Sequence, residues 1–216
     1  GQASLPNVFS HFGWPTLGQL SGSAPWRANV NVRKRQVDIS VDSSLQGVSS
    51  SLPEPFNKST NATLPFRLDI SPQDATRTQY RVTLGKQLKA LLIQRDSGNK
   101  TDWEKGIVVI GEGDLRLPER ALSVHVGLPQ VDGDAWRKLY ASVGANGKAT
   151  SDSPDIRQGT GLALGQIRLK TPRLRLLDRE QHQVDVTLRP KEADWLLSLN
   201  MSEIQGDLLW RTAGEG

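Results

Sequence analysis

Apolar and polar residues alternate one by one along most of this sequence, and this period of two constrains the fold more than any other feature. The alternation recurs in many runs, whose apolar members are Val30 and Val32; Val37, Ile39 and Val41; Tyr80, Val82 and Leu84; Leu122, Val124 and Val126; Ile167 and Leu169; Leu174 and Leu176; Val184, Val186 and Leu188; Trp195, Leu197 and Leu199; Leu208 and Trp210. Successive side chains of a strand point to opposite faces, so each run predicts a strand with one apolar face and one polar, solvent-exposed face.

Strands of this kind are typical of antiparallel sheets that are covered on one side only. Turn-forming sequences separate the runs, among them Asp96-Ser97-Gly98-Asn99, Gly111-Glu112-Gly113-Asp114 and Gln205-Gly206-Asp207. The pattern therefore predicts an all-β chain. It leaves open whether the strands close into a sandwich or a barrel or form an open, curved sheet.

One segment follows the helical period instead. Between Asp132 and Val143 the apolar residues fall at helical spacing, and Gly144 is a residue type that commonly ends a helix. Asp132 or Asp134 can cap the first turn. We therefore predict one short amphipathic helix over about residues 132–143.

The rest of the chain fits a single β-segment over residues 1–216. We expect residues 1–25 to be irregular, and residues 145–160, which are rich in Gly, Ser, Asp and Asn, to form a long flexible loop. Residues 86–92 allow either a helix or a strand, and we favour the strand.

Composition narrows the possible functions. The 216 residues carry 27 Lys and Arg against 23 Asp and Glu, a formal net charge of +4, which is too small an excess to indicate a nucleic-acid partner. The absence of cysteine excludes disulfides, thiolate metal sites and cysteine nucleophiles. No stretch of the sequence is apolar enough over about 18 residues to span a membrane as a helix.

Motifs for catalysis are missing. The three histidines, His11, His125 and His182, have no partner at metal-ligand spacing, and the chain contains neither a nucleophile elbow nor a phosphate-binding P-loop. His125 lies between Val124 and Val126, which places it on the polar side of its strand. We predict no catalytic residue, no metal, no cofactor and no enzymatic activity. A carbohydrate-active enzyme, which would need two inward-facing carboxylates, stays as an alternative.

The most basic segment lies near the middle of the second half. Its cations Arg168, Lys170, Arg173 and Arg175 alternate with apolar residues, provided that Thr171-Pro172 forms a turn. They are candidate contacts for lipid head groups beside an apolar channel. The alternative is an ordinary solvated outer face.

Three segments resemble one protein family. Residues 45–58, LQGVSSSLPEPFNK, and the LPFRL that begins at Leu64 are similar to the signature L-x-G-x-x-S-x-LP-x-P-x-x-K followed by LP; residues 127–136, GLPQVDGDAW, resemble a strand that runs into a D-x-D-x-W helix start. Residues 195–200 and 204–210 resemble a closing hairpin of the form W-x-L-x-L and G-x-i-x-W. The family is that of the AsmA-like proteins, in their YhdP branch.

The resemblance implies more than the periodicity does. It implies a Gram-negative envelope protein, held in the inner membrane by a helix that this chain lacks, and extended across the periplasm as a taco-like β-groove. It implies a role in moving phospholipid between the inner and outer membranes, which supports the outer-membrane permeability barrier. This chain would then be an internal or near-terminal segment of a longer protein, reaching both membranes through other parts.

Under this hypothesis phospholipid acyl chains occupy the apolar side of the strands. The residues that we predict to line the groove are Val82, Leu84, Val124, Val126, Leu164, Leu169, Leu174, Val186 and Leu197. An alternative of a different class is a closed β-sandwich that serves as a scaffolding or interaction module of the envelope.

Overall fold

The computed structural model describes residues 1–4, 19–33, 36–98, 100–146, 162–192 and 194–211. Its elements, in chain order, are β1 (Gln2–Ser4), β2 (Leu20–Arg33), β3 (Gln36–Ser43), β4 (Val48–Ser50), β5 (Phe66–Pro72), β6 (Arg77–Leu84), β7 (Leu88–Asp96), β8 (Thr101–Gly111), β9 (Ala121–Gly127), β10 (Val131–Asp132), α2 (Gly133–Asn146), β11 (Leu164–Leu176), β12 (Arg179–Lys191), β13 (Asp194–Asn200) and β14 (Gln205–Trp210).

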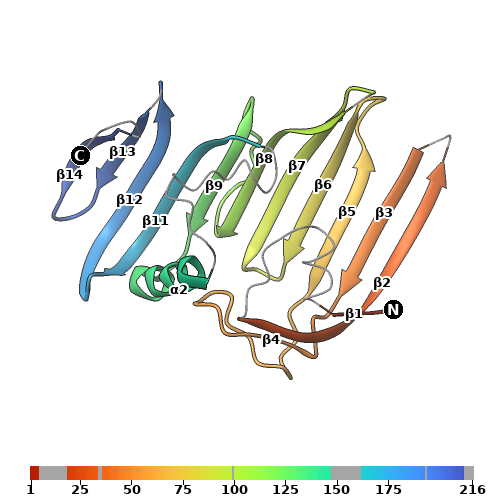
Figure 1. The fold of residues 1–216 in the computed structure, drawn as a ribbon, viewed down its shortest axis with the longest axis horizontal. Helices are drawn as coiled ribbons and strands as arrows, with labels where there is room; N and C mark the ends of the chain where they lie inside the picture. The colour runs from red at the N-terminus through yellow and green to blue at the C-terminus, as the bar shows by residue number, and fades with distance from the viewer. Residues whose placement is uncertain (5–18, 34–35, 99, 147–161, 193, 212–216) are drawn as a thin grey trace.

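The strands form one open sheet whose order is β1-β2-β3-β5-β6-β7-β8-β9-β11-β12-β13-β14, with β4 attached to β2 and β10 to β11. Figure 1 shows the strands side by side in a single layer, with the N-terminus at one end of the sheet and the C-terminus at the other. The predicted all-β, open and curved sheet with one short helix is confirmed. The closed sandwich is wrong, because no second sheet covers the first among the described residues.

The sheet is mixed, however, and not wholly antiparallel. β9 is parallel to both of its neighbours, β8 and β11. The sequence Gly111-Glu112-Gly113-Asp114, which we expected to form a hairpin turn, instead begins a longer connection over residues 112–120 that returns the chain to the start of β9. A parallel partner requires such a crossover, because the chain must travel back along the strand before it can pair again.

The N-terminal part is also more regular than expected. β2 begins at Leu20, inside the region 1–25 that we predicted to be irregular. Its first residues pair with β4 and β1, and its later residues with β3. Gly22 and Gly47 allow the two backbones to approach closely here, because both have a left-handed φ, and a Cβ on Gly22 would collide with the carbonyl oxygen of Gly47 and one on Gly47 with that of Ser23.

Three other predicted boundaries have different outcomes. The helix begins and ends close to the predicted range, at Gly133 and Asn146, and residues 86–92 contribute to strand β7. The sequence Gln205-Gly206-Asp207 belongs to strand β14 and not to a turn. The predicted loop 145–160 lies almost wholly outside the described residues.

Cross-strand pairing divides the side chains of the sheet between two faces. One of them, which we call the apolar face, carries one continuous set of side chains: Trp26, Ala28, Val30 and Val32 of β2; Val37, Ile39 and Val41 of β3; Phe66, Leu68 and Ile70 of β5; Tyr80, Val82 and Leu84 of β6; Leu88, Ala90 and Leu92 of β7; Val108 and Ile110 of β8; Leu122, Val124 and Val126 of β9; Leu164, Ile167 and Leu169 of β11; Val184, Val186 and Leu188 of β12; Trp195, Leu197 and Leu199 of β13; Leu208 and Trp210 of β14.

The most densely packed core lies on the other side, which we call the opposite face. Leu91, Ile107 and Val109 form a buried cluster there, and Ile107 and Val109 are 0% exposed. The connection between β8 and β9 covers this cluster, since its residues Leu115 and Leu117 pack against it. This cluster is therefore separate from the apolar face, which has buried members of its own in Ala90 and Val184.

Candidate functional site

The apolar face is extensive and only partly covered. Most of its side chains are partly buried; Val30 at one end is 63% exposed and Leu208 at the other 56%. Few of its members are fully buried, among them Ala90 and Val184. Exposed apolar patches larger than a few hundred Å² are rare in monomeric proteins and mark binding surfaces.

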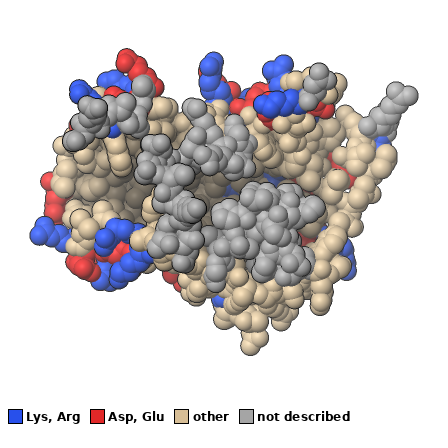
Figure 2. Space-filling view, in the orientation of Figure 1, with Lys and Arg blue, Asp and Glu red and all other residues tan. Residues whose placement is uncertain are grey.

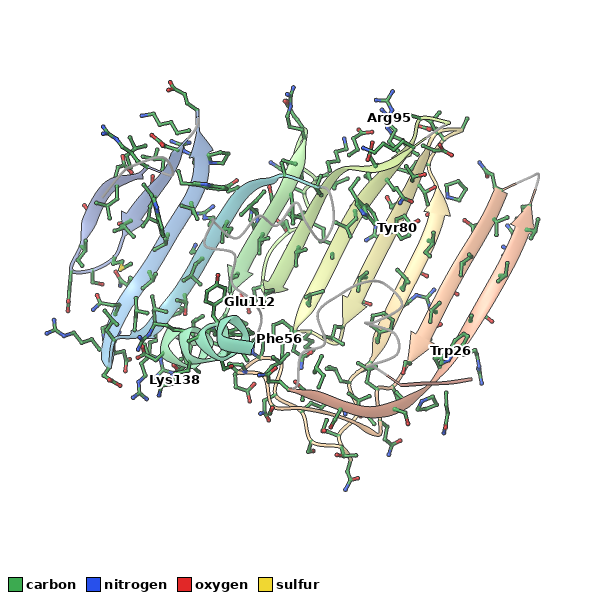
Figure 3. All side chains as sticks on the ribbon, in the orientation of Figure 1. Trp26, Phe56, Tyr80, Arg95, Glu112 and Lys138 are labelled. Carbon is green, nitrogen blue, oxygen red and sulfur yellow. The ribbon has the colours of Figure 1, made fainter. Side chains whose placement is uncertain are left out.

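Charged side chains flank this surface and do not interrupt it. Outside the grey atoms, Figure 2 shows mostly tan atoms on this face, with Lys, Arg, Asp and Glu gathered along the upper edge, at the lower left and at the two sides. Figure 3 places Arg95 at the upper edge, Tyr80 in the sheet and Lys138 at the lower edge. The apolar face is therefore bordered by charged side chains that stay in contact with solvent.

The structure brings together eight of the nine residues predicted to line a groove. The eight that share the apolar face are Val82, Leu84, Val124, Val126, Leu164, Leu169, Val186 and Leu197. Whether lipid contacts them stays a prediction.

Leu174 stands apart from the other eight. β11 continues through Thr171-Pro172 without a turn, and the buried positions change parity there, from Thr171 to Leu174. Leu174 is 6% exposed and pairs with Val131 of β10, immediately before the helix. It packs beneath the start of α2 and does not contribute to the open surface.

The four cations predicted near head groups do not border the apolar face as a set. Arg168 and Lys170 lie on the opposite face, and Arg168 makes a two-point ion pair with Asp185 of β12, with N–O distances of 3.0 and 2.7 Å. This pairing holds the pKa of Asp185 below its usual range. Arg175 pairs with Asp178 at 3.1 Å, and Arg173 is exposed. Whether any of the four cations contacts a head group stays a prediction.

His125 also lies on the opposite face, in register with Arg168 of β11, as its position between two valines predicts. Partial burial and the neighbouring guanidinium lower the pKa of its imidazole. The described residues contain no group of three or more His, Asp or Glu side chains arranged to hold a metal ion.

Two irregular segments meet at the lower edge of the sheet. The phenyl ring of Phe56, which follows β4, meets the indole ring of Trp136 on α2 edge to face, with centroids 6.1 Å apart and planes at 86°. Figure 3 shows Phe56 beside the helix. This contact joins residues 51–57 to the helix, although the two segments lie 80 residues apart in the sequence.

Each of these segments is fixed by its own polar contacts. On one side, Lys58 is 8% exposed, and its ammonium group donates to the carbonyl oxygens of Val48 at 2.7 Å and Ser59 at 3.1 Å. Backbone hydrogen bonds between Ser50 and Lys58 close the loop between them. Burial lowers the pKa of the Lys58 ammonium group.

On the other side, two aspartates anchor the helix. Asp132 caps it by accepting a hydrogen bond from the backbone N–H of Ala135 at 2.9 Å. The buried carboxylate of Asp134 accepts hydrogen bonds from the backbone N–H groups of Leu177 and Asp178, both at 2.9 Å. Those two residues form the left-handed turn of the β11–β12 hairpin, so Asp134 ties α2 to the sheet.

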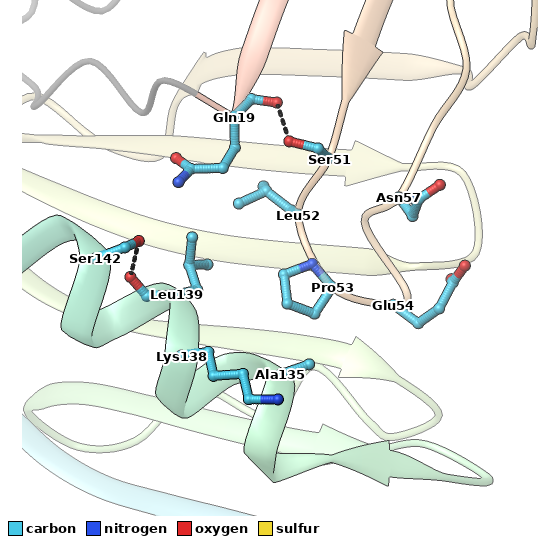
Figure 4. Close-up of a pocket in the computed structure, with 10 residues that line it drawn as sticks. All are labelled: Gln19, Ser51, Leu52, Pro53, Glu54, Asn57, Ala135, Lys138, Leu139 and Ser142. Carbon is cyan, nitrogen blue, oxygen red and sulfur yellow. Dashed lines mark hydrogen bonds between the residues drawn. The ribbon is translucent and has the colours of Figure 1, made fainter.

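A cleft of about 470 Å³ lies between the two segments. Figure 4 shows Leu52 and Leu139 facing each other across it, Gln19 and Ser51 on one wall, and Lys138 and Ser142 on the helix. Sequence reasoning did not predict this cleft. Residues 51–57, which belong to one segment of the family resemblance, supply most of one wall, whereas the other resembling segment, 127–136, supplies only Ala135 to the helix wall.

No helix among the described residues has the length and apolarity that crossing a bilayer requires. Neither the curated proteins nor the solved structures contain a match to this chain. A family model described as YhdP protein does match, and its match runs over residues 1–216. The chain therefore belongs to the YhdP family.

Proposed function

We propose that this chain is a segment of a lipid-transfer protein, and that phospholipid acyl chains move along its apolar face. The observation that carries the proposal is the continuous apolar face from β2 to β14, which is left partly exposed, while the buried cluster of Leu91, Ile107 and Val109 lies on the opposite face. YhdP family membership fits a lipid-transfer role in the cell envelope. On this proposal the whole protein connects the inner and outer membranes across the periplasm, anchored in the inner membrane, and supports the permeability barrier.

The physical requirement for such transfer is large. Exposing two acyl chains of about 16 carbons to water costs on the order of 25 kcal/mol, at about 0.8 kcal/mol for each methylene. A conduit must replace almost all of that contact at every step along the path. A row of strands whose apolar side chains follow each other without a break provides this contact, and charged rims let head groups remain in water.

The chemistry needs no bond to be made or broken. The proposal therefore includes no catalytic residue, no cofactor and no nucleic-acid partner. The acyl chains contact Val, Leu and Ile side chains through dispersion and the hydrophobic effect, which are non-directional and tolerate movement along the surface.

Site-specific photocrosslinking tests the proposal with matched pairs of neighbouring positions. A photoreactive residue at Val82 or Leu169 projects from the apolar face, whereas one at Arg81 or Lys170 projects from the opposite face of the same strand. In cells, we expect phospholipid adducts from the first position of each pair and at most background from the second. Equal capture from both positions of each pair would refute the proposal.

A further inference from the structure

The polarity of the apolar face changes along the strands in the middle of the sheet. β6 runs from the upper edge of the sheet, at Arg77, to the lower edge, at Leu84 (Figure 1). The row of side chains nearest the lower edge crosses five strands and is wholly apolar. It consists of Phe66, Leu84, Leu88, Ile110 and Val126. The row nearest the upper edge on β6, β7 and β8 consists of Thr78, Gln94 and Trp103. On these strands the face therefore ends in hydrocarbon at one edge and in hydrogen-bonding groups at the other.

Aromatic side chains mark the level at which this change occurs. The rings of Tyr80 and Trp103 meet edge to face with centroids 5.0 Å apart, and the Tyr80 hydroxyl donates to Oε1 of Gln94 at 2.7 Å. On β13 and β14, Trp195 pairs with Trp210 near the same edge. Tyr and Trp gather at the boundary between a bilayer core and its head groups, because their rings are apolar at one end and form hydrogen bonds at the other. The upper edge of the apolar face has the same composition as that boundary.

Charged groups beyond this row pair with one another. Arg77 donates to Glu104 at 2.8 Å and to Asp74 at 3.1 Å, and Lys100 pairs with Asp102 at 2.9 Å. Both signs of charge are therefore present in a hydrated border. A head group in this border keeps its contact with water, whatever its own charge, and so avoids the free-energy cost of burying a polar group.

The lower edge is occupied by other parts of the chain. β4, residues 51–57 and α2 lie along it, and the Phe56–Trp136 ring contact joins the last two (Figure 1). Trp26, the tryptophan of the apolar face at this edge, pairs with the N-terminal residue Gly1. A head group placed here would lie against the apolar row and lose part of its hydration, which is unfavourable.

The distance between the two rows matches the length of an acyl chain. A strand rises about 3.4 Å per residue, so Thr78 and Leu84 lie about 20 Å apart along β6. The acyl chains of one leaflet fill about 15 Å, half of a hydrocarbon core of about 30 Å. An acyl chain that extends along the strand therefore fits between the polar row and the lower edge.

We infer that each phospholipid lies along the strands in the middle of the sheet, with its acyl chains directed to the lower edge and its head group at the upper edge, beyond Tyr80, Gln94 and Trp103. This orientation rests on the proposed function, because it concerns the same lipid on the same face. Transfer then moves the lipid sideways from strand to strand, while the head group stays in water throughout.

Two photoreactive phospholipids test this orientation. One carries its photoreactive group on the head group, and the other carries it at the methyl end of an acyl chain. Each is added in trace amount to phosphatidylcholine vesicles, which are mixed with the 216-residue chain and irradiated before digestion with trypsin. Cleavage after Arg77, Arg81 and Lys86 separates the upper peptide 78–81 from the lower peptide 82–86.

We expect the head-group probe to label peptide 78–81 at least about fivefold more than peptide 82–86, and the chain-end probe to show the reverse preference. Peptides 101–105 and 106–116 of β8, which cleavage after Lys105 separates, should repeat this result.

A substitution in the upper row tests its part in the orientation. Gln94→Leu replaces a polar member of that row by hydrocarbon and should lower the preference of the head-group probe by about fivefold, the value of one hydrogen bond. Gln79→Leu, the same change at the neighbouring level of the opposite face, is the matched control and should leave the preference unchanged. Unfolding curves check that both variants remain folded.

The outcomes separate this orientation from the proposed function. Labelling of the lower peptides by the head-group probe and of the upper peptides by the chain-end probe would overturn the orientation, as would equal labelling of both by each probe. A head-group preference that folded Gln94→Leu leaves unchanged would overturn it too, because the polar row would then not direct the lipid. If neither probe labels any of the four peptides, phospholipid does not occupy this face and the proposed function itself fails.

Discussion

Ile107 and Ile110 lie three residues apart on β8 and face opposite sides of the sheet. Ile107 is 0% exposed in the core of the opposite face, whereas Ile110 is partly exposed on the apolar face. The same residue type thus serves two purposes within one strand. One side chain stabilises the fold, and the other supplies surface for a ligand.

Truncating the two side chains should have unequal costs. Ile107→Ala leaves a cavity in a packed core and should lower the free energy of unfolding by about 2–5 kcal/mol. Ile110→Ala removes a side chain that already contacts solvent and should cost less than about 2 kcal/mol. Urea unfolding of both variants measures the difference. Equal losses would mean that the apolar face is part of the folding core.

The sequence predicted this two-sided arrangement only in part. Simple alternation correctly placed residues such as Val82 and Val124 on one face, since period two maps directly onto the two sides of a strand. The run Ile107-Val108-Val109-Ile110 breaks the alternation, and such a run is typical of strands buried on both sides, as parallel strands are. We read the turn sequence that follows it as a hairpin, and so missed the crossover that covers the opposite face.

Other features depend on contacts between distant segments, which periodicity does not report. Leu174 follows the alternation of its own arm, but β11 continues through Pro172 without the expected turn, and Leu174 lies beneath the start of α2. The ring contact of Phe56 with Trp136 arises only when segments far apart in sequence meet. The motifs that resemble the family include Phe56 and Trp136, but the sequence alone does not indicate that the two residues contact each other.

The ring contact between Phe56 and Trp136 should contribute measurably to stability. In a double-mutant cycle with Phe56→Leu and Trp136→Leu, we expect a coupling free energy of about 0.5–1.5 kcal/mol, typical of edge-to-face aromatic pairs. Phe56→Leu combined with Trp210→Leu is the control, because Trp210 is 69% exposed at the far edge of the sheet. That second pair should be additive. Coupling no larger than in the control pair would mean that the two segments are not joined by this contact.

Lys58 should stabilise the loop that it anchors through its ammonium group and not through its aliphatic chain. Lys58→Met preserves the chain but leaves the carbonyl groups of Val48 and Ser59 without their donor, at a cost of about 1–3 kcal/mol in the free energy of unfolding. Lys89→Met, at an exposed position, should change that free energy by less than about 0.5 kcal/mol. Chemical denaturation compares them, and an unchanged or increased stability of Lys58→Met would contradict this role.

Asp134 should make stability depend on pH. Hydrogen bonds from the backbone of Asp178 and Leu177 lower the pKa of its carboxyl group in the folded state. The folded protein therefore binds this proton less readily than the unfolded chain, so the stabilisation is present above the unfolded pKa of about 3.9 and is lost as pH falls through the folded pKa.

Asp134→Asn cannot ionise and should remove this contribution. At pH 7 we expect the thermal midpoint of the variant to fall by about 2–4 °C relative to the wild type. The gap between the two proteins should narrow as pH falls below about 4. Thermal melts at several pH values measure the gap, and a gap that stays constant from neutral to acid pH would show that the carboxylate charge has no part in holding the hairpin turn.

Charges placed on the apolar face should block lipid without unfolding the chain. Val124 and Val126 lie on β9 in the middle of that face, and replacing both by Asp introduces two carboxylates that an acyl chain cannot solvate. We expect crosslinked phospholipid from Val82 in this background to fall at least about tenfold, because uncompensated charge against an acyl chain costs several kcal/mol. Arg81→Asp with Lys89→Asp, on the opposite face, is the matched control and should preserve capture. Undiminished capture in the Val124 and Val126 variant, with the protein still folded, would show that lipid does not pass over β9.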